Sequence, residues 1–405
     1  MGWKVFLPDR YIKPVENKVH EIAGSVASCL PDEGGMMGGK AGLACFCAYY
    51  ADWTGDQAFN GLAADLIEKA LNPAAGRFPA YKYSDGLSGV AWLIHHLSST
   101  GLMNLDAASI FDELDQHLYK FMMAEIKSGH YDFLHGALGT ALYFLRQPKN
   151  EKSRAYLSEL VSELERIAKN EPDGSLKWLS VLDAENNKTG YNLSLSHGLA
   201  SIIIVVSMIM KEDIMKETCE RLLQGSFRYM EKQKLNSGEY ISSFPSWALE
   251  SMDEVHDSRM AWCYGDLGIG LAYLKAGCLL PGSSYQQDGL AILKKTSLRR
   301  DPAENRVFDA GICHGASGLA LFYNILSQTT EQKMYEDAAL HWLDVCLNMA
   351  LHEDGLAGYK SWYHPEYGGW KNTAGLLEGV SGIGLVLMSF ISAKEPSWAR
   401  SLLLI

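Results

Sequence analysis

Apolar stretches of two kinds alternate along the chain. In one kind nearly every position is apolar, as in residues 90–94 and 319–323, which is typical of helices buried on all sides. In the other kind apolar residues recur at helical spacing, with charged residues on the opposite face. Such amphipathic stretches follow Asp56, Asp106, Lys152, Glu212 and Thr330. The pattern predicts an all-α protein in which buried inner helices alternate with half-exposed outer helices.

The buried stretches share a start signal, because each follows a Gly-x-x-Gly pattern. The six clear copies are Gly39/Gly42, Gly86/Gly89, Gly136/Gly139, Gly265/Gly268, Gly315/Gly318 and Gly379/Gly382. A seventh copy begins at Gly198, where Ser201 replaces the second glycine. Each interval has room for two helices, so we expect a single α/α-toroid domain over residues 1–405, with seven outer and seven inner helices and no inserted domain. An open helical solenoid would have the same local signature.

Composition and charge argue against several classes of protein. A chain of 405 residues with 47% hydrophobic and 21% charged residues can bury a large core. Its net charge of -12 argues against a nucleic-acid partner. No apolar run reaches the roughly 18 residues that a membrane span needs. The N-terminal residues carry neither a signal-peptide pattern nor a myristoylation pattern, so we expect a cytoplasmic protein.

The repeat places candidate chemistry at equivalent positions. Cys263 and Cys313 both lie two residues before the first glycine of their repeats, and His314 and His197 lie one residue before theirs. Equivalent positions in consecutive repeats should meet at one rim of a toroid. Two cysteines and a histidine with a vacant fourth position are typical of catalytic zinc. The alternative is two ordinary buried thiols and a hydrogen-bonded histidine.

The other cysteines suggest packing and not chemistry. Cys45, Cys47, Cys219, Cys278 and Cys346 lie inside apolar helical patterns, where buried structural thiols are expected. In a large chain without signs of secretion, free thiols are the expectation.

Four segments resemble the lanthionine synthetase C-like family, and the resemblance extends over nearly the whole chain. They are Trp262-Cys263-Tyr264-Gly265, Cys313-His314-Gly315, the segment from Asn192 to Gly198, and Tyr131-Asp132 before Gly136.

The resemblance implies a set of site residues. It assigns Cys263, Cys313 and His314 as ligands of Zn²⁺, and His197, Asp132 and Arg259 as active-site residues. Three positions depart from the family pattern. Ser196 and Ser201 stand where relatives tend to have small apolar residues or glycine, and His135 occupies a variable place. These departures leave the expected zinc ligands untouched but put the local geometry at His197 in doubt.

The same resemblance implies the reaction. The protein would be a lanthionine synthetase, a cyclase that adds peptide cysteine thiols to dehydroalanine or dehydrobutyrine and forms lanthionine or methyllanthionine thioether rings. The substrate would be a dehydrated precursor peptide, and a dehydratase and a transporter would be partners. The placement of the long interval before Cys263, and not the resemblance, makes residues 235–257 the candidate for contact with the leader of that peptide. Two alternatives are a zinc-dependent thiol alkyltransferase and a LanC-like zinc protein that binds a peptide or a glutathione-like thiol without cyclase activity.

Overall fold

A computed structural model gives the structure of the protein. It describes residues 2–27, 29–72, 80–105, 107–147, 149–183, 186–236, 238–250 and 256–405, and for residues 107–113 the backbone alone. The predicted cap Asp106 and parts of the predicted leader-contact segment 235–257 lie outside the described residues. The chain divides into two compact units, unit 1 with residues 1–112 and 297–405 and unit 2 with residues 113–296.

Seven helices begin at the residue after the first glycine of each repeat. They are α2 (Lys40–Thr54), α4 (Leu87–Ser99), α6 (Ala137–Phe144), α8 (Leu199–Lys211), α10 (Asp266–Gly277), α12 (Ala316–Thr330) and α14 (Val380–Ile391). Their side chains are buried on nearly all sides, as the apolar runs predicted. The repeat pattern thus locates the start of every one of these helices.

Seven further helices have one buried and one exposed face. They are α1 (Asp9–Val26), α3 (Gln57–Leu71), α5 (Ala107–Lys127), α7 (Glu151–Ile167), α9 (Lys216–Glu231), α11 (Tyr285–Thr296) and α13 (Lys333–Asn348). Asp56 caps α3 by accepting a hydrogen bond from the backbone N–H of Ala58. A side-chain acceptor of this kind satisfies one of the unpaired amides at a helix start.

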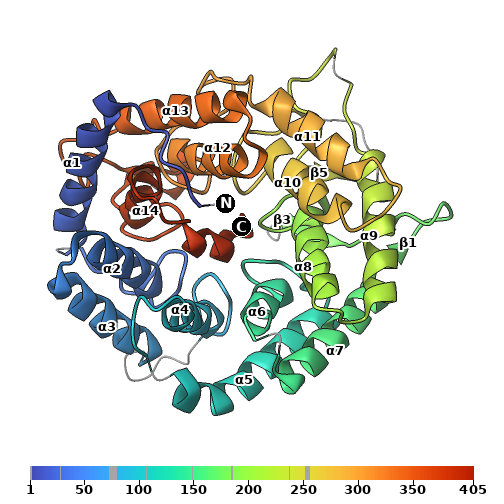
Figure 1. Cartoon of the computed structure of the whole chain (residues 1–405). Coiled ribbons are helices and arrows are strands. Elements are labelled where there is room, and N and C mark those ends of the chain that lie inside the picture. Colours follow the sequence, from blue (N-terminus) through green and yellow to red (C-terminus); the bar gives the residue numbers. More distant parts are fainter. Residues whose placement is uncertain are drawn as a thin grey trace. The chain divides into compact units, whose positions relative to one another are not determined.

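Unit 1 joins the two ends of the chain. Its buried helices α12, α14, α2 and α4 pack side by side in that order, and α13, α1 and α3 cover them (Figure 1). The last long helix, α14, therefore packs against the first, α1. Shorter elements of this unit are β6 (Ser361–Trp362), β7 (Trp370–Lys371), η1 (Pro365–Tyr367) and η2 (Ser397–Leu402), and β6 pairs antiparallel with β7.

Unit 2 repeats this arrangement and adds most of the short strands. Helices α6, α8 and α10 pack in order, with α7, α9 and α11 against them. The added strands are β1 (Lys169–Asn170), β2 (Leu176–Lys177), β3 (Ser180–Asp183), β4 (Lys188–Asn192) and β5 (Trp247–Ala248). Strands β1 and β2 form a hairpin, and β4 pairs antiparallel with both β3 and β5. Strand β4 leads directly into the turn before α8, which carries His197.

The cysteines follow the predicted burial with one exception. Cys45, Cys47, Cys219 and Cys346 are buried, whereas Cys278 is exposed at the end of α10. The prediction of a buried thiol was wrong for Cys278 because α10 ends at Gly277, before the apolar pattern does. Burial raises the pKa of Cys47 to about 12. Thiols of this kind stay protonated at neutral pH and are poor nucleophiles.

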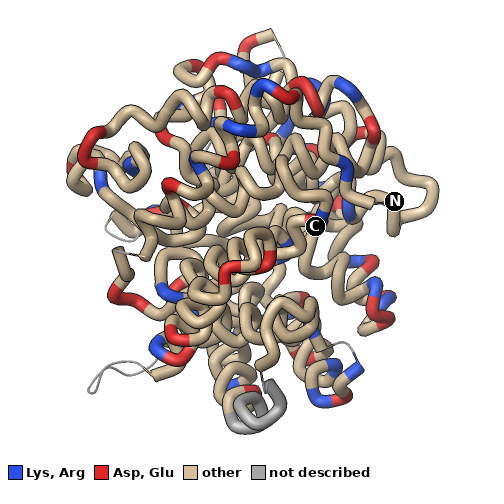
Figure 2. Tube along the Cα trace, turned by 60° about the vertical axis from the view of Figure 1, so that its left-hand side comes forward, with Lys and Arg blue, Asp and Glu red and all other residues tan. Residues whose placement is uncertain are grey.

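Charged residues of both signs are interspersed along the trace (Figure 2). No helix in the described part of the chain is long and apolar enough to cross a membrane.

Candidate active site

The candidate active site in unit 2 is built around one carboxylate and one imidazole. Asp132 lies in the turn before α6, where its Oδ1 accepts hydrogen bonds from the backbone N–H groups of Leu134 at 2.8 Å and His135 at 2.9 Å. Its other oxygen, Oδ2, is 2.7 Å from Nδ1 of His197. The turn therefore fixes the carboxylate, and the carboxylate fixes the imidazole.

Hydrogen bonds within its own turn position His197. Asn192, at the end of β4, accepts a hydrogen bond from the backbone N–H of Ser194 at 3.0 Å. The hydroxyl of Ser194 accepts one from the backbone N–H of His197 at 3.1 Å. Short polar side chains commonly form such local bonds before a helix starts. They hold the backbone of His197 while Asp132 holds its ring.

The pair shifts the pKa values of both partners. Burial by itself raises the pKa of Asp132, but the hydrogen bond and the charge of His197, with help from His135, leave it below its usual value. Burial lowers the pKa of His197, but the hydrogen bond and charge of Asp132, together with nearby Cys263, leave it above its usual value. Both shifts favour an ionised pair, in which His197 carries a proton to donate.

Two aromatic rings border His197. The ring of His135 stacks on it with centroids 5.6 Å apart and an angle of 19° between the planes. The ring of Tyr264 lies 5.9 Å away, and the Tyr264 hydroxyl accepts a hydrogen bond from the amide of Asn192 at 3.3 Å. His135 is exposed, so it forms the outer edge of the site.

Backbone bonds join this turn to the predicted zinc ligand Cys263. The carbonyl of Cys263 accepts hydrogen bonds from the backbone N–H groups of Leu195 at 3.2 Å and Ser196 at 3.3 Å, and from the Ser196 hydroxyl at 3.2 Å. A Cβ on Gly268 would lie 2.6 Å from the Cβ of Leu195, so this glycine lets α10 start against the His197 turn. Gly265 has a φ of +94°. The motif glycines therefore bring Cys263 to the His197 turn.

The other two predicted ligands lie in unit 1. Cys313 donates its backbone N–H to the carbonyl of Leu377 at 2.8 Å. His314 places Nε2 3.5 Å from Oδ2 of Asp309, whose side chain is 1% exposed. A carboxylate beside one ring nitrogen of a histidine is the usual support for a metal ligand that binds through the other nitrogen.

The structure thus brings Asp132, His197 and Cys263 together within unit 2 and supports His314 within unit 1. Arg259 lies half-buried in the turn before α10, and its catalytic role stays a prediction. Sequence reasoning missed the contributions of Ser196 and Asp309. Ser196 was noted only as a departure from the family pattern, and Asp309 had no signal beyond its place before a cysteine-histidine pair.

Comparison with known proteins identifies the family. The model of the family "Lanthionine synthetase C-like protein" matches residues 31–403. The chain belongs to this family. Among curated proteins, the chain is 25% identical over 342 residues to nisin biosynthesis protein NisC from Lactococcus lactis subsp. lactis, which covers 79% of this chain and 76% of that protein.

Among solved structures, nisin cyclase matches with a TM-score of 0.76 and 20% identity, covering 98% of each chain. This match confirms the predicted all-α fold, an α/α-toroid, and it indicates no inserted domain. The resemblance seen in the sequence is confirmed by the family match.

Proposed function

We propose that this protein is a zinc-dependent lanthipeptide cyclase, which forms thioether rings in a dehydrated peptide. One observation carries the proposal: His197, which is paired with Asp132, lies in a turn that also holds the backbone of Cys263. An acid–base pair is thereby placed beside a predicted metal ligand. Membership of the lanthionine synthetase C-like family supports the same reaction.

The proposed ligands of zinc are Cys263, Cys313 and His314, one from unit 2 and two from unit 1. Two thiolates and an imidazole are donors that zinc prefers, and three protein ligands leave a fourth position for a substrate. Asp309 beside Nε2 of His314 supports binding through Nδ1. Zinc bound there would lower the pKa of a substrate cysteine thiol, so that the thiolate is present at neutral pH.

His197 then handles the proton. The substrate sulfur forms a bond to the β-carbon of the dehydro residue, and the electron pair of the double bond moves toward the α-carbon and its carbonyl as an enolate. Because Asp132 holds Nδ1, Nε2 is the nitrogen of His197 that delivers one proton to the α-carbon. The raised pKa of His197 keeps that proton available near neutral pH. The thiol proton is released to solvent when the thiolate forms, and neutral His197 takes up one proton from solvent afterwards, so the product has the same atoms as the substrate.

The test uses a dehydrated peptide with one dehydroalanine and one cysteine. With zinc-loaded protein, we expect the free thiol to disappear with no change in peptide mass, measured by alkylation and mass spectrometry. Cys263→Ala should lose zinc and activity, whereas Cys278→Ala, which removes an exposed thiol of the same unit, should keep both. Zinc binding without thiol consumption would refute the cyclase and favour the thiol-binding alternative.

A precursor peptide follows as the substrate under this proposal. A dehydratase that makes the dehydro residues, a transporter and a cytoplasmic location stay predictions.

A further inference from the structure

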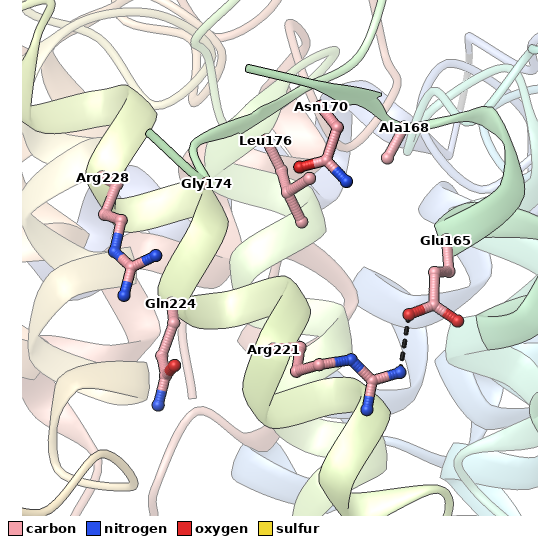
Figure 3. Close-up of a pocket in the computed structure, with 8 residues that line it drawn as sticks. All are labelled: Glu165, Ala168, Asn170, Gly174, Leu176, Arg221, Gln224 and Arg228. Atoms are coloured by element: carbon pink, nitrogen blue, oxygen red, sulfur yellow. Dashed lines mark hydrogen bonds and ion pairs between the residues drawn. The ribbon is translucent and has the colours of Figure 1, made fainter. Parts of the chain in front are cut away.

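A separate pocket of about 320 Å³ lies in unit 2, away from the residues of the candidate active site. It is formed by the end of α7, the β1–β2 hairpin and one face of α9 (Figure 3). Pockets of this size hold a small molecule or a few residues of a peptide. Its lining mixes charged and amide side chains with an apolar one, and each part has a distinct role.

Arg228 supplies a guanidinium without a charged partner. In the described part of the chain, this side chain makes no hydrogen bond and no ion pair, and it is exposed. It lies under the hairpin turn at Gly174, where a Cβ would be 2.7 Å from its Nη1. Gly174 has a φ of +77°. The glycine therefore gives the turn its conformation and leaves space for the guanidinium.

The other lining groups add polar contacts. Arg221 is 2.7 Å from Glu165, and both side chains are about half exposed, so a competing anion can displace this pair. The amide of Asn170 points into the pocket beside Leu176, and Gln224 lies on the facing side of α9 (Figure 3). Two arginines against one glutamate give the lining a positive balance, in contrast to the net charge of -12 of the whole chain.

These features favour a carboxylate ligand with apolar neighbours. Arginine forks match the geometry of carboxylates, and the amide of Asn170 can bond to a peptide backbone. The volume exceeds what one inorganic anion needs, and Leu176 offers an apolar surface. We propose that this pocket binds an acidic segment of the peptide substrate, outside the ring that is being formed; the proposal rests on the proposed cyclase function.

The hairpin connects this pocket to the candidate active site. Strand β2 leads through Trp178 to β3, which begins at Ser180. The hydroxyl of Tyr131 bonds to the carbonyl of Trp178 at 3.3 Å and to the hydroxyl of Ser180. Tyr131 immediately precedes Asp132, so this segment runs from the lining of the pocket to the residue beside Asp132. A peptide held in the pocket would have its remaining length available to reach His197.

The first test measures binding alone. The probes are a fluorescein-labelled hexapeptide of alternating leucine and aspartate, and the same peptide with asparagine in place of aspartate, followed by fluorescence anisotropy. We expect the aspartate peptide to bind about tenfold more tightly, and Arg228→Gln to remove that preference, because a charge-assisted hydrogen bond is typically worth a factor of ten or more. Arg10→Gln removes an exposed arginine of α1 and should change nothing.

The second test measures turnover. A dehydrated peptide is supplied with and without an added stretch of aspartate and leucine, and Arg228→Gln should raise KM about tenfold only for the extended peptide, with kcat unchanged. Equal binding of both hexapeptides, or loss of the preference in Arg10→Gln, would overturn the proposal. Inorganic phosphate bound with the same dependence on Arg228, without a preference between the peptides, would identify a general anion site and also overturn it. Failure of cyclisation with intact peptide binding would count against the cyclase function and leave the pocket assignment standing.

Discussion

Replacing Asp132 by asparagine is the sharpest test of the candidate active site. In the wild type, Oδ1 accepts two backbone N–H groups, from Leu134 and His135, and Oδ2 faces Nδ1 of His197. In Asp132→Asn the same two backbone N–H groups can bond only to the carbonyl oxygen of the new side chain. The NH₂ group of the asparagine then faces His197. The NH₂ group can only donate, so Nδ1 must accept and the proton moves to Nε2. The substitution should therefore reverse the tautomer of His197 and disfavour its charged form.

The expected size follows from the contacts. A hydrogen bond between charged partners contributes about 2 kcal/mol when it is shielded from water, and both side chains here are only about a quarter exposed. The pKa of His197, which lies above its usual value, should fall below it, since burial then acts without compensation. Loss of a positioned general acid costs about 10²-fold to 10⁴-fold in rate. Zinc affinity should change little, because the hydrogen bonds of Asp132 described above go to Leu134, His135 and His197 and not to a proposed zinc ligand.

The assay combines two measurements. Titration of the His197 ring by NMR, assigned with His197→Gln, gives the direction of the pKa change, and alkylation of free cysteines gives the rate of ring formation. Asp65→Asn, which removes an exposed carboxylate paired with Lys69 on α3, is the matched control and should alter neither. A His197 that keeps its raised pKa in Asp132→Asn, or a variant with full activity, would refute the reasoning.

Three further predictions concern stability and metal binding. Gly265→Ala should lower the free energy of unfolding by about 3 kcal/mol, because φ is +94° and the new Cβ would lie 2.1 Å from the carbonyl oxygen of Arg259. The control Gly61→Ala adds a Cβ in open space within α3 and should raise the free energy of unfolding by about 0.5–1 kcal/mol. Urea unfolding measures both. Ser196→Ala should lower zinc affinity by about tenfold in a chelator competition, since it loosens the backbone of Cys263; an effect no larger than that of Ser207→Ala, whose hydroxyl bonds only within α8, would contradict this. In metal-free protein, folding lowers the pKa of Asp132, so the stability that Asp132 contributes is present above about pH 4 and is lost as the pH falls through its pKa in the folded protein. Folding raises the pKa of His197, so the stability that His197 contributes is complete below about pH 6.5 and is lost as the pH rises through its pKa in the folded protein. The difference in thermal stability between wild type and Asp132→Asn should therefore be largest between about pH 4 and 6.5, and a difference independent of pH would contradict the ionised pair.

The sequence predicted the buried helices well because their signal is strong and local. Each begins directly after a glycine and is apolar on nearly every side, so these helices could be recognised without an analysis of periodicity or capping residues. Two outer helices gave weaker signals. Helix α1 contains Pro14, and α11 contains Gly289, where a Cβ would lie 2.7 Å from the backbone N of Leu274. The glycine that lets α11 approach α10 closely also interrupts the periodicity by which a helix is recognised.

The candidate site was predicted in its chemical groups but not in its supports. Residues next to the motif glycines could be aligned by counting, which gave Cys263, Cys313, His314 and His197 as candidates. The hydroxyl of Ser196 could not be assigned in this way, because its partner is a backbone carbonyl 67 residues away in the chain. Contacts of this kind depend on which backbone groups the helix starts leave unpaired, and a residue pattern does not record that.

His197 and His314 show why the residues that position a site cannot be predicted from the repeat. Asp132 and Asp309 are bound in a similar way. One carboxylate oxygen accepts two backbone N–H groups of its own turn in Asp132 and one in Asp309, and the other oxygen lies near a histidine. Asp309 supports His314 of its own repeat, whereas Asp132 supports His197 of the following repeat. Asp132 binds Nδ1, but Asp309 lies beside Nε2, so opposite nitrogens of the two rings are left for chemistry. A bound aspartate thus supports both an acid–base histidine and a proposed zinc ligand. The two differ in whether the aspartate and the histidine belong to the same repeat, and the spacing of the glycines does not show this.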